Sequence, residues 1–235
     1  MSDLESIKND AMIDARAEME AFNIASEESA LEQCIYLFVE GESEEIAFRI
    51  LLEEGLGIDF EKEGIVIANY NGIGNLGHTI RLMLKTLSHS KPMVFTFDDD
   101  DKKLVSKLGG VPQNVYMFKI PYKPVVTFPN GESGGSFEES FLPEDFVNAC
   151  FETTLLRENS HIEKQNFIKY FDSKKPFYKQ IVIYLKERGL TNYLPNKIEI
   201  AEELACNVNP VPDTYFRLEK LIREIRKQHP IQIKI

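Results

Sequence analysis

Acidic residues stand at the ends of several predicted elements in this sequence: Glu40, Glu44, Asp98, Asp100 and Glu138. Adjacent parallel strands lie about 4.8 Å apart, so acids at neighbouring strand ends converge. Carboxylates at such short distances from one another cannot all stay ionised at neutral pH without a cation, because like charges disfavour one another. A hard divalent ion held by oxygen atoms, Mg²⁺ or Mn²⁺, resolves the repulsion. Beside a phosphate backbone, such an ion indicates phosphodiester chemistry.

Strands and helices alternate in the part of the chain that must position these acids. Apolar runs predict four strands, at Cys34–Val39, Gly64–Tyr70, Met93–Phe97 and Val115–Ile120. Helices are expected between them, at about Glu44–Glu54 with Ser43 as N-cap, and at about His78–Ser88. This order predicts an α/β fold with a doubly wound, mostly parallel sheet of about four strands. Open sheets of this kind place their ligands at the carboxyl edge, where Glu40 and Asp98 fall.

The rest of the chain reads as helical. Polar residues from Ser2 to about Leu31 carry Met12, Ala15, Met19 and Phe22 near helical spacing, which predicts an amphipathic helix. After a loop at Pro121–Gly135, helical segments are expected at Gln165–Phe171, Lys175–Arg188, Lys197–Cys206 and Asp213–Gln228. We therefore expect an N-terminal helix over 1–32, a core over 33–125 and a C-terminal helical subdomain over 126–235.

Charge is divided unevenly along the 235 residues, whose net charge is −11. Residues 1–160 hold 13 basic and 29 acidic residues, and residues 161–235 hold 14 basic and 9 acidic ones. In the basic part, aromatic residues such as Phe167, Phe177 and Tyr184 alternate with lysines. That pattern is typical either of base stacking on nucleic acid or of a helix core with solvated lysines.

The sequence also bears on where the protein works. No apolar run approaches the roughly 18 residues that cross a bilayer, and the first ten residues lack the basic-then-apolar order of a signal peptide. The three cysteines are widely spaced, which argues against a disulfide framework or a zinc site. We expect a cytoplasmic protein without a membrane partner.

The motifs then match a family. The sequence VEGESEE at a strand end, a glycine turn after the second strand and a D-x-D after the third resemble the Toprim domain of topoisomerases, primases and related nucleases. VEGESEE followed by AFRILLEE is most similar to the OLD (overcoming lysogenization defect) nucleases and their relatives in bacterial antiphage systems. The resemblance implies a metal site made of Glu40, Glu44, Asp98, Asp100, and Ser136 with Glu138, and a catalytic lysine at Lys197.

Several assignments within the resemblance stay open. A one-residue slip of register would replace Asp98 and Asp100 with Asp99 and Asp101. Glu139 could take the place of Glu138. Three other lysines could serve a phosphate equally well, namely Lys174, Lys175 and Lys179.

The resemblance implies a divalent-metal-dependent endonuclease that cleaves DNA or RNA. Glu40 and Asp98 would hold the metal, Glu40 would help activate water, and Lys197 would offset charge on the phosphate. OLD proteins usually carry an ATPase domain, but the sequence has no Walker loop, so we expect a separate ATPase partner. A homodimer is a further candidate assembly. The alternative is a non-catalytic Toprim-fold module for binding or assembly.

A different class of protein also fits part of the pattern. Gly72, Gly74 and Gly77 spell G-x-G-x-x-G after a strand, and Asp98 follows the next strand, as in a Rossmann dinucleotide site. That interpretation leaves Glu40 and Glu44 without a role. The same glycines would let backbone approach a metal or phosphate in the Toprim interpretation.

Overall fold

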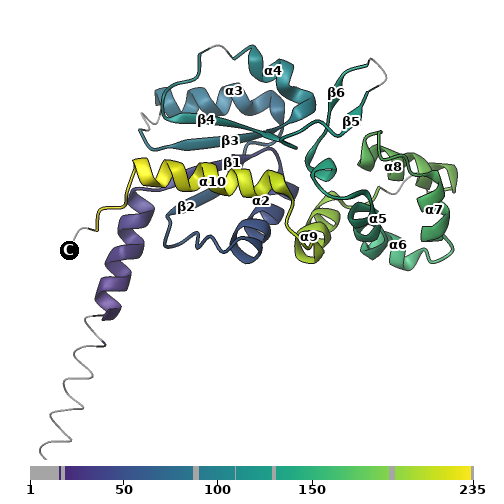
Figure 1. The fold of residues 1–235 in the computed structure, drawn as a ribbon, viewed down its shortest axis with the longest axis horizontal. Helices are drawn as coiled ribbons and strands as arrows, with labels where there is room; N and C mark the ends of the chain where they lie inside the picture. The colour runs from purple at the N-terminus through teal and green to yellow at the C-terminus, as the bar shows by residue number, and fades with distance from the viewer. Residues whose placement is uncertain are drawn as a thin grey trace, which may run out of the picture.

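The computed structural model describes residue 16 and residues 19–86, 90–108, 110–128, 131–190 and 194–233, without the side chains of Thr86, Asp100 and Leu104. Its centre is a sheet of four parallel strands in the order β2-β1-β3-β4 (Figure 1). The strands are β1 (Ile35–Val39), β2 (Ile65–Asn69), β3 (Met93–Asp98) and β4 (Val115–Ile120). The predicted parallel sheet is confirmed.

Helices cover both faces of this sheet, which explains why its strands are almost continuously apolar. Val94 packs into one apolar layer together with Phe48 and Tyr215, and its neighbour Phe95 packs into the other with Leu76. The first layer includes α2 (Glu42–Arg49), α9 (Lys197–Asn207) and α10 (Asp213–Gln228), and the second includes α3 (Ile73–Arg81) and α4 (Lys102–Ser106) (Figure 1). Successive strand residues therefore point to opposite layers.

A group of short helices extends from one end of the sheet (Figure 1). It comprises a 3-10 turn (Phe137–Ser140), α5 (Pro143–Glu152), α6 (Thr154–Glu158), α7 (Lys164–Tyr170) and α8 (Phe177–Glu187). Phe167, Phe177 and Tyr184 are fully buried there, so these aromatics form helix core and are not available for base stacking. The predicted loop before this group contains a short hairpin, β5 (Val126–Thr127) with β6 (Ser133–Gly134).

Two predicted helix starts were wrong. The helix after β1 begins at Glu42 with Gly41 as N-cap, so Ser43 lies inside the helix and does not cap it. The helix after β2 begins at Ile73 and not at His78, because Gly72 adopts φ +91° and turns the chain directly from the strand into the helix. Glu40 and Glu44 therefore lie close to the sheet edge.

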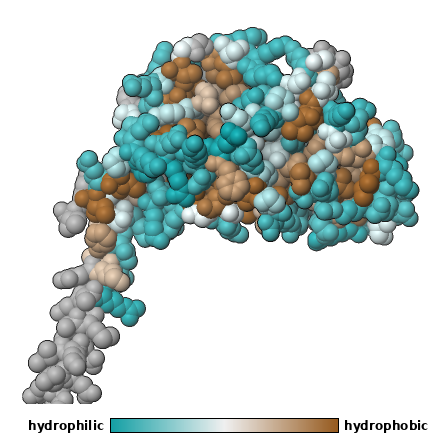
Figure 2. Space-filling view, viewed as in Figure 1, coloured by the Kyte–Doolittle hydropathy of each residue, from teal (hydrophilic) through white to brown (hydrophobic). Residues whose placement is uncertain are grey.

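Residues 19–32 form a helix that projects away from the sheet (Figure 1). Met19, Phe22, Ile24 and Leu31 on it are 48 to 65% exposed, and Figure 2 shows hydrophobic surface along its described part. Most of the predicted helix before Met19, including Met12 and Ala15, lies outside the described residues. Within the described part of the chain, no helix is both long and apolar enough to cross a bilayer.

Candidate metal centre

Glu40 lies at the centre of the candidate site. It directly follows β1, beside the end of β3. The backbone amides of Ile73 and Asp98 both donate hydrogen bonds to its carboxylate, the first with an N···Oε1 distance of 3.3 Å. Its Oε2 atom is buried and has no hydrogen-bond partner among the described residues. A buried carboxylate oxygen without a donor is the kind of atom that a bound cation would satisfy.

The surroundings of Glu40 disfavour its ionised form. Burial, followed by the negative charges of Asp101 and Glu44, raises the pKa of Glu40 to about 7. The two backbone donors oppose this shift but do not cancel it. Burial also raises the pKa of the Asp101 carboxyl. This part of the site therefore holds carboxylates that lack a nearby balancing cation among the described side chains.

Asp99 belongs to a different environment. Its side chain is fully buried, and its two oxygens pair with Lys119 Nζ at 2.8 Å and Lys102 Nζ at 3.4 Å. Lys119 comes from β4 and Lys102 from α4, and Lys102 also donates to the carbonyl of Ser133 in β6 at 2.5 Å. Asp99 therefore ties three elements together and is already neutralised, which removes it from the candidate metal ligands.

The turn after β3 explains which aspartates approach Glu40. Asp98 ends β3 with extended backbone, and Asp99–Asp101 then form one turn of 3-10 helix. After this turn, the charge of Asp101 acts on Glu40. The predicted partner Asp100 has a side chain outside the described set. Asp101, which the sequence left open as an alternative to Asp100, is thus an aspartate whose charge reaches Glu40.

A second group of charges lies on the α2 side of the sheet edge. Burial raises the pKa of Glu44, and the charge of Glu138 raises it further while Lys197 opposes the shift. Gly41 makes this arrangement fit, because a Cβ there would approach Glu44 Oε2 to 3.1 Å. Lys197 Nζ lies 3.5 Å from Glu138 Oε1. Three predicted residues that are distant in sequence are therefore brought together.

The structure distinguishes Glu138 from Glu139. Glu139 accepts from the backbone of Ser136 at 2.6 Å and of Phe177 at 2.5 Å, so it fixes the 3-10 turn to the start of α8. Ser136 Oγ lies 2.7 Å from Glu138 Oε2 and 2.6 Å from Glu139 Oε2. Glu138 directs its other oxygen toward Lys197. Glu139 has a structural role, and Glu138 remains available to the site.

Among the candidate lysines, Lys197 lies within the carboxylate cluster. It is the first residue of α9, whose N-cap Asn196 accepts from the Ile198 amide at 2.9 Å. Burial alone would lower the pKa of Lys197, but Glu138, Glu44 and Asp98 together raise it, so the ammonium form is favoured. Lys175 instead pairs with Asp172 at 3.2 Å.

Two buried tyrosines flank the cluster and were not expected from the sequence. Tyr70 donates to the carbonyl of Thr96 at 2.8 Å, and the hydroxyl of Tyr215 lies 3.4 Å from Ser140 Oγ. Burial, reinforced by the nearby carboxylates, raises the pKa of both tyrosines. Their hydroxyl groups therefore stay protonated, and both side chains beside the charged site are neutral.

The donor set fits a hard dication, although no ligand cage is preformed. In the described ranges, no three His, Cys, Asp or Glu side chains are arranged as a metal-binding group. The available donors are carboxylate oxygens with a hydroxyl nearby, the ligands that Mg²⁺ and Mn²⁺ prefer. The unpartnered oxygen of Glu40 and the raised pKa values around it agree with that chemistry.

The glycine turn serves Glu40 in this structure. The amide of Ile73, directly after Gly72, donates to the Glu40 carboxylate, which takes a position that a phosphate would need in a Rossmann site. β1 also separates β2 from β3, so Asp98 ends a strand about 10 Å from β2. A Rossmann acid belongs on the strand beside the glycine turn. The geometry therefore disfavours dinucleotide binding.

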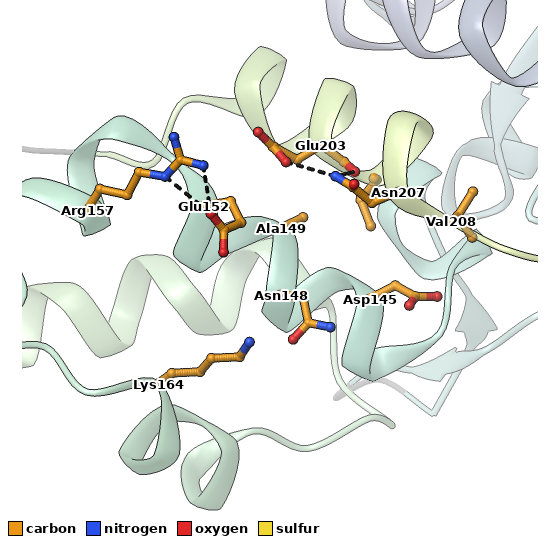
Figure 3. A pocket seen from close by; sticks show the side chains of 10 residues that line it. Asp145, Asn148, Ala149, Glu152, Arg157, Lys164, Glu203, Asn207 and Val208 are labelled. Atoms are coloured by element: carbon orange, nitrogen blue, oxygen red, sulfur yellow. Dashed lines mark hydrogen bonds and ion pairs between the residues drawn. The ribbon is translucent and has the colours of Figure 1, made fainter. Parts of the chain in front are cut away.

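A separate cavity of about 500 Å³ lies among α5, α6, α7 and α9 (Figure 3). Within it, Arg157 pairs with Glu152 at 2.6 Å, and Asn207 donates to Glu203 at 2.9 Å. None of the predicted site residues lines this cavity. The carboxylate cluster is instead built at the sheet edge.

Comparisons with known proteins agree with this arrangement. Residues 35–100 match the family model "Overcoming lysogenization defect protein-like, TOPRIM domain". The matched segment contains Glu40, Glu44 and the start of the aspartate run. Together with the fold, this match shows that residues 35–100 resemble a Toprim domain of the OLD-like family.

Solved structures show the same fold over most of the chain. The platinum-phased C-terminal region of the Xanthomonas campestris pv. campestris OLD protein is 19% identical, with a TM-score of 0.51, and the match covers 86% of this chain and 98% of that one. The iodine-phased structure of the same region is 20% identical, with a TM-score of 0.51 and coverage of 83% and 97%. A search of curated proteins found no match.

Proposed function

We propose that this protein is a divalent-metal-dependent nuclease that cleaves phosphodiester bonds in DNA or RNA. The observation that carries the proposal is the buried Oε2 of Glu40, which has no hydrogen-bond partner among the described residues and lies within a group of carboxylates. The match to the OLD-like Toprim family supports it. Bound Mg²⁺ or Mn²⁺ would supply Lewis-acid chemistry at the phosphate.

The residues divide into two groups by role. Glu40, Asp98 and Asp101 would hold one cation at the ends of β1 and β3. Glu44 and Glu138 would complete the site on the α2 side, with Ser136 near Glu138. Asp100 remains a proposed ligand from its place in the sequence.

Lys197 has a distinct role in this proposal. Its ammonium group, 3.5 Å from Glu138, would stabilise the negative charge that develops on the phosphate. Glu40, ionised while it holds the cation, would help activate the attacking water. Tyr70 and Tyr215 would remain neutral and limit access of bulk water.

The test is nicking of supercoiled plasmid and cutting of RNA with Mg²⁺ or Mn²⁺. The wild-type protein should cleave at least one substrate, and chelation by EDTA should stop cleavage. Glu40→Ala should be inactive, whereas Glu54→Ala, which changes an exposed glutamate in the helical segment that follows Glu40, should be fully active. Equal activity of Glu40→Ala and wild type would refute the proposal.

A separate ATPase partner would control this activity in the cell, where we place the protein in the cytoplasm. The helix over residues 19–32 exposes four apolar side chains to a potential partner. Co-purification with an ATPase, and a change of cleavage on adding ATP to the complex, would support this arrangement. A complex that binds but never cleaves nucleic acid would favour the non-catalytic binding module. Light scattering would test the homodimer.

A further inference from the structure

An exposed aromatic residue lies close to the carboxylate cluster. Tyr122 follows β4 by two residues, and the last residue of β4, Ile120, is in register with Asp98. With strands about 4.8 Å apart and consecutive Cα atoms 3.8 Å apart, the Cα of Tyr122 lies within about 12 Å of that of Asp98. Tyr122 is therefore on the rim of the proposed active site.

The Tyr122 ring is held in place from behind. The guanidinium carbon of Arg217 lies 4.3 Å from the ring centroid, and Arg217 Nε pairs with Asp213 Oδ2 at 2.7 Å. The amide of Tyr122 donates to Thr214 Oγ1 at 3.1 Å. Both supports come from the first turns of α10, so backbone and ring are fixed to one rigid helix.

Tyr122 nevertheless remains accessible, with 44% of the residue exposed. A surface aromatic residue is often only a solvated side chain, and Phe216, 47% exposed on the same helix, provides the comparison. No cation lies over the Phe216 ring among the described residues. Tyr122 differs because it combines exposure, an arginine backing and a place beside the cluster. Exposed Lys123 follows it directly.

These features match the requirements for binding an unpaired nucleobase. Aromatic rings stack bases with little regard to sequence, arginine adds a cation–π contribution, and a nearby lysine can contact phosphate. A base in a duplex already stacks on its neighbours and presents no free face. The chemistry therefore selects a strand that is single, frayed or splayed next to the phosphate at the carboxylates.

We infer that Tyr122, backed by Arg217, is a stacking site for an unpaired base of the substrate strand. The inference deepens the proposed nuclease function, on which it rests for the identity of the ligand. It assigns the substrate class: nucleic acid with at least one unpaired base beside the cleaved bond. Binding can be measured separately from cleavage, so the two proposals can fail independently.

The experiment uses a fluorescein-labelled single strand with phosphorothioate linkages, which resist cleavage, in the presence of Ca²⁺. Tyr122→Ala should weaken binding about tenfold, within the range measured for the loss of one base–aromatic stack. Tyr122→Phe and the matched control Phe216→Ala should bind as wild type does. Circular dichroism would establish that each variant is folded.

A second readout reports stacking itself. A strand carrying 2-aminopurine at successive positions should lose fluorescence at one position on binding wild-type protein, and this quenching should disappear with Tyr122→Ala. Unchanged affinity and quenching in Tyr122→Ala would overturn the inference, as would equal losses in Tyr122→Ala and Phe216→Ala. Wild-type protein that stacks the strand but cuts no substrate would support the inference while counting against the nuclease proposal.

Discussion

Asp99 and Glu40 lie at the same edge of the sheet but meet opposite electrostatic surroundings. Asp99 is fully buried, with two lysines on its carboxylate. Glu40 is flanked by two other carboxylates, and one of its oxygens has no partner among the described residues. A buried acid with its counter-ions supplied holds structure together, whereas one without them is suited to bind a cation from solution. The two can therefore be separated by experiment.

The largest expected effect falls on the structural acid. Asp99→Ala leaves two lysines without their partner and should lower the free energy of unfolding by about 3 kcal/mol. This is the low end of the range for a broken buried ion pair, because both lysines reach solvent. Urea denaturation would measure the loss. The control Asp59→Asn removes an exposed aspartate that pairs with Lys62 at 2.8 Å, and should cost less than about 1 kcal/mol. Equal costs would contradict the anchoring role of Asp99.

The next effect concerns the lysine in the cluster. Lys197→Met should reduce the cleavage rate by about 100-fold, because it removes the positive charge that faces the phosphate. Its fold should be retained, since half of the side chain is exposed. Lys179→Met, a change at an exposed lysine of α8, should leave the rate unchanged. If Lys179→Met were the slower variant, the catalytic lysine would have been assigned wrongly.

A smaller effect tests the register of the aspartate run. Asp101→Asn should weaken Mn²⁺ binding and cleavage by about 10- to 100-fold, with little change in stability, because Asp101 lies beside Glu40 in a partly exposed turn. Asp98→Asn should behave similarly. Full Mn²⁺ affinity in Asp101→Asn would favour Asp98 and Asp100, the D-x-D pair, as the metal ligands.

These aspartates show what the sequence could and could not predict. The order of strands and helices, and the meeting of Glu40 with the end of β3, follow from apolar periodicity and parallel strand geometry. The register could not be predicted, because a 3-10 turn follows β3, in which Asp99 pairs with Lys102 and Lys119 while the charge of Asp101 acts on Glu40. No local sequence pattern predicts that turn. Glu139 was likewise separable from Glu138 only through its contact with Phe177, 38 residues away.

The last predicted effect is on stability as a function of pH. Without metal, an unfolded chain ionises Glu40 near its ordinary pKa of about 4.5, while the folded protein keeps the proton until about pH 7. The folded state binds more protons in that window, so stability falls as pH rises through it. Glu40→Gln removes this cost and should stabilise the metal-free protein at pH 8 by about 1–3 kcal/mol.

The pH dependence supplies its own control. The stabilisation by Glu40→Gln should be much smaller at pH 5, where Glu40 is protonated in the folded protein and resembles glutamine. Thermal melts in EDTA at both pH values would measure it, with Glu54→Gln as the exposed comparison. A Glu40→Gln variant that is less stable than wild type at pH 8 would contradict the raised pKa.

The most direct test of the central claim is calorimetric titration of Mn²⁺ into the protein at pH 7, in two buffers with different ionisation enthalpies. The account predicts saturable binding that releases protons, because Glu40 must lose its proton to hold a cation. Both the binding and the proton release should be lost in Glu40→Gln and retained in Glu54→Gln. Wild-type protein that binds no Mn²⁺, or that binds it equally well without the Glu40 carboxylate, would contradict the claim that this cluster is a metal centre.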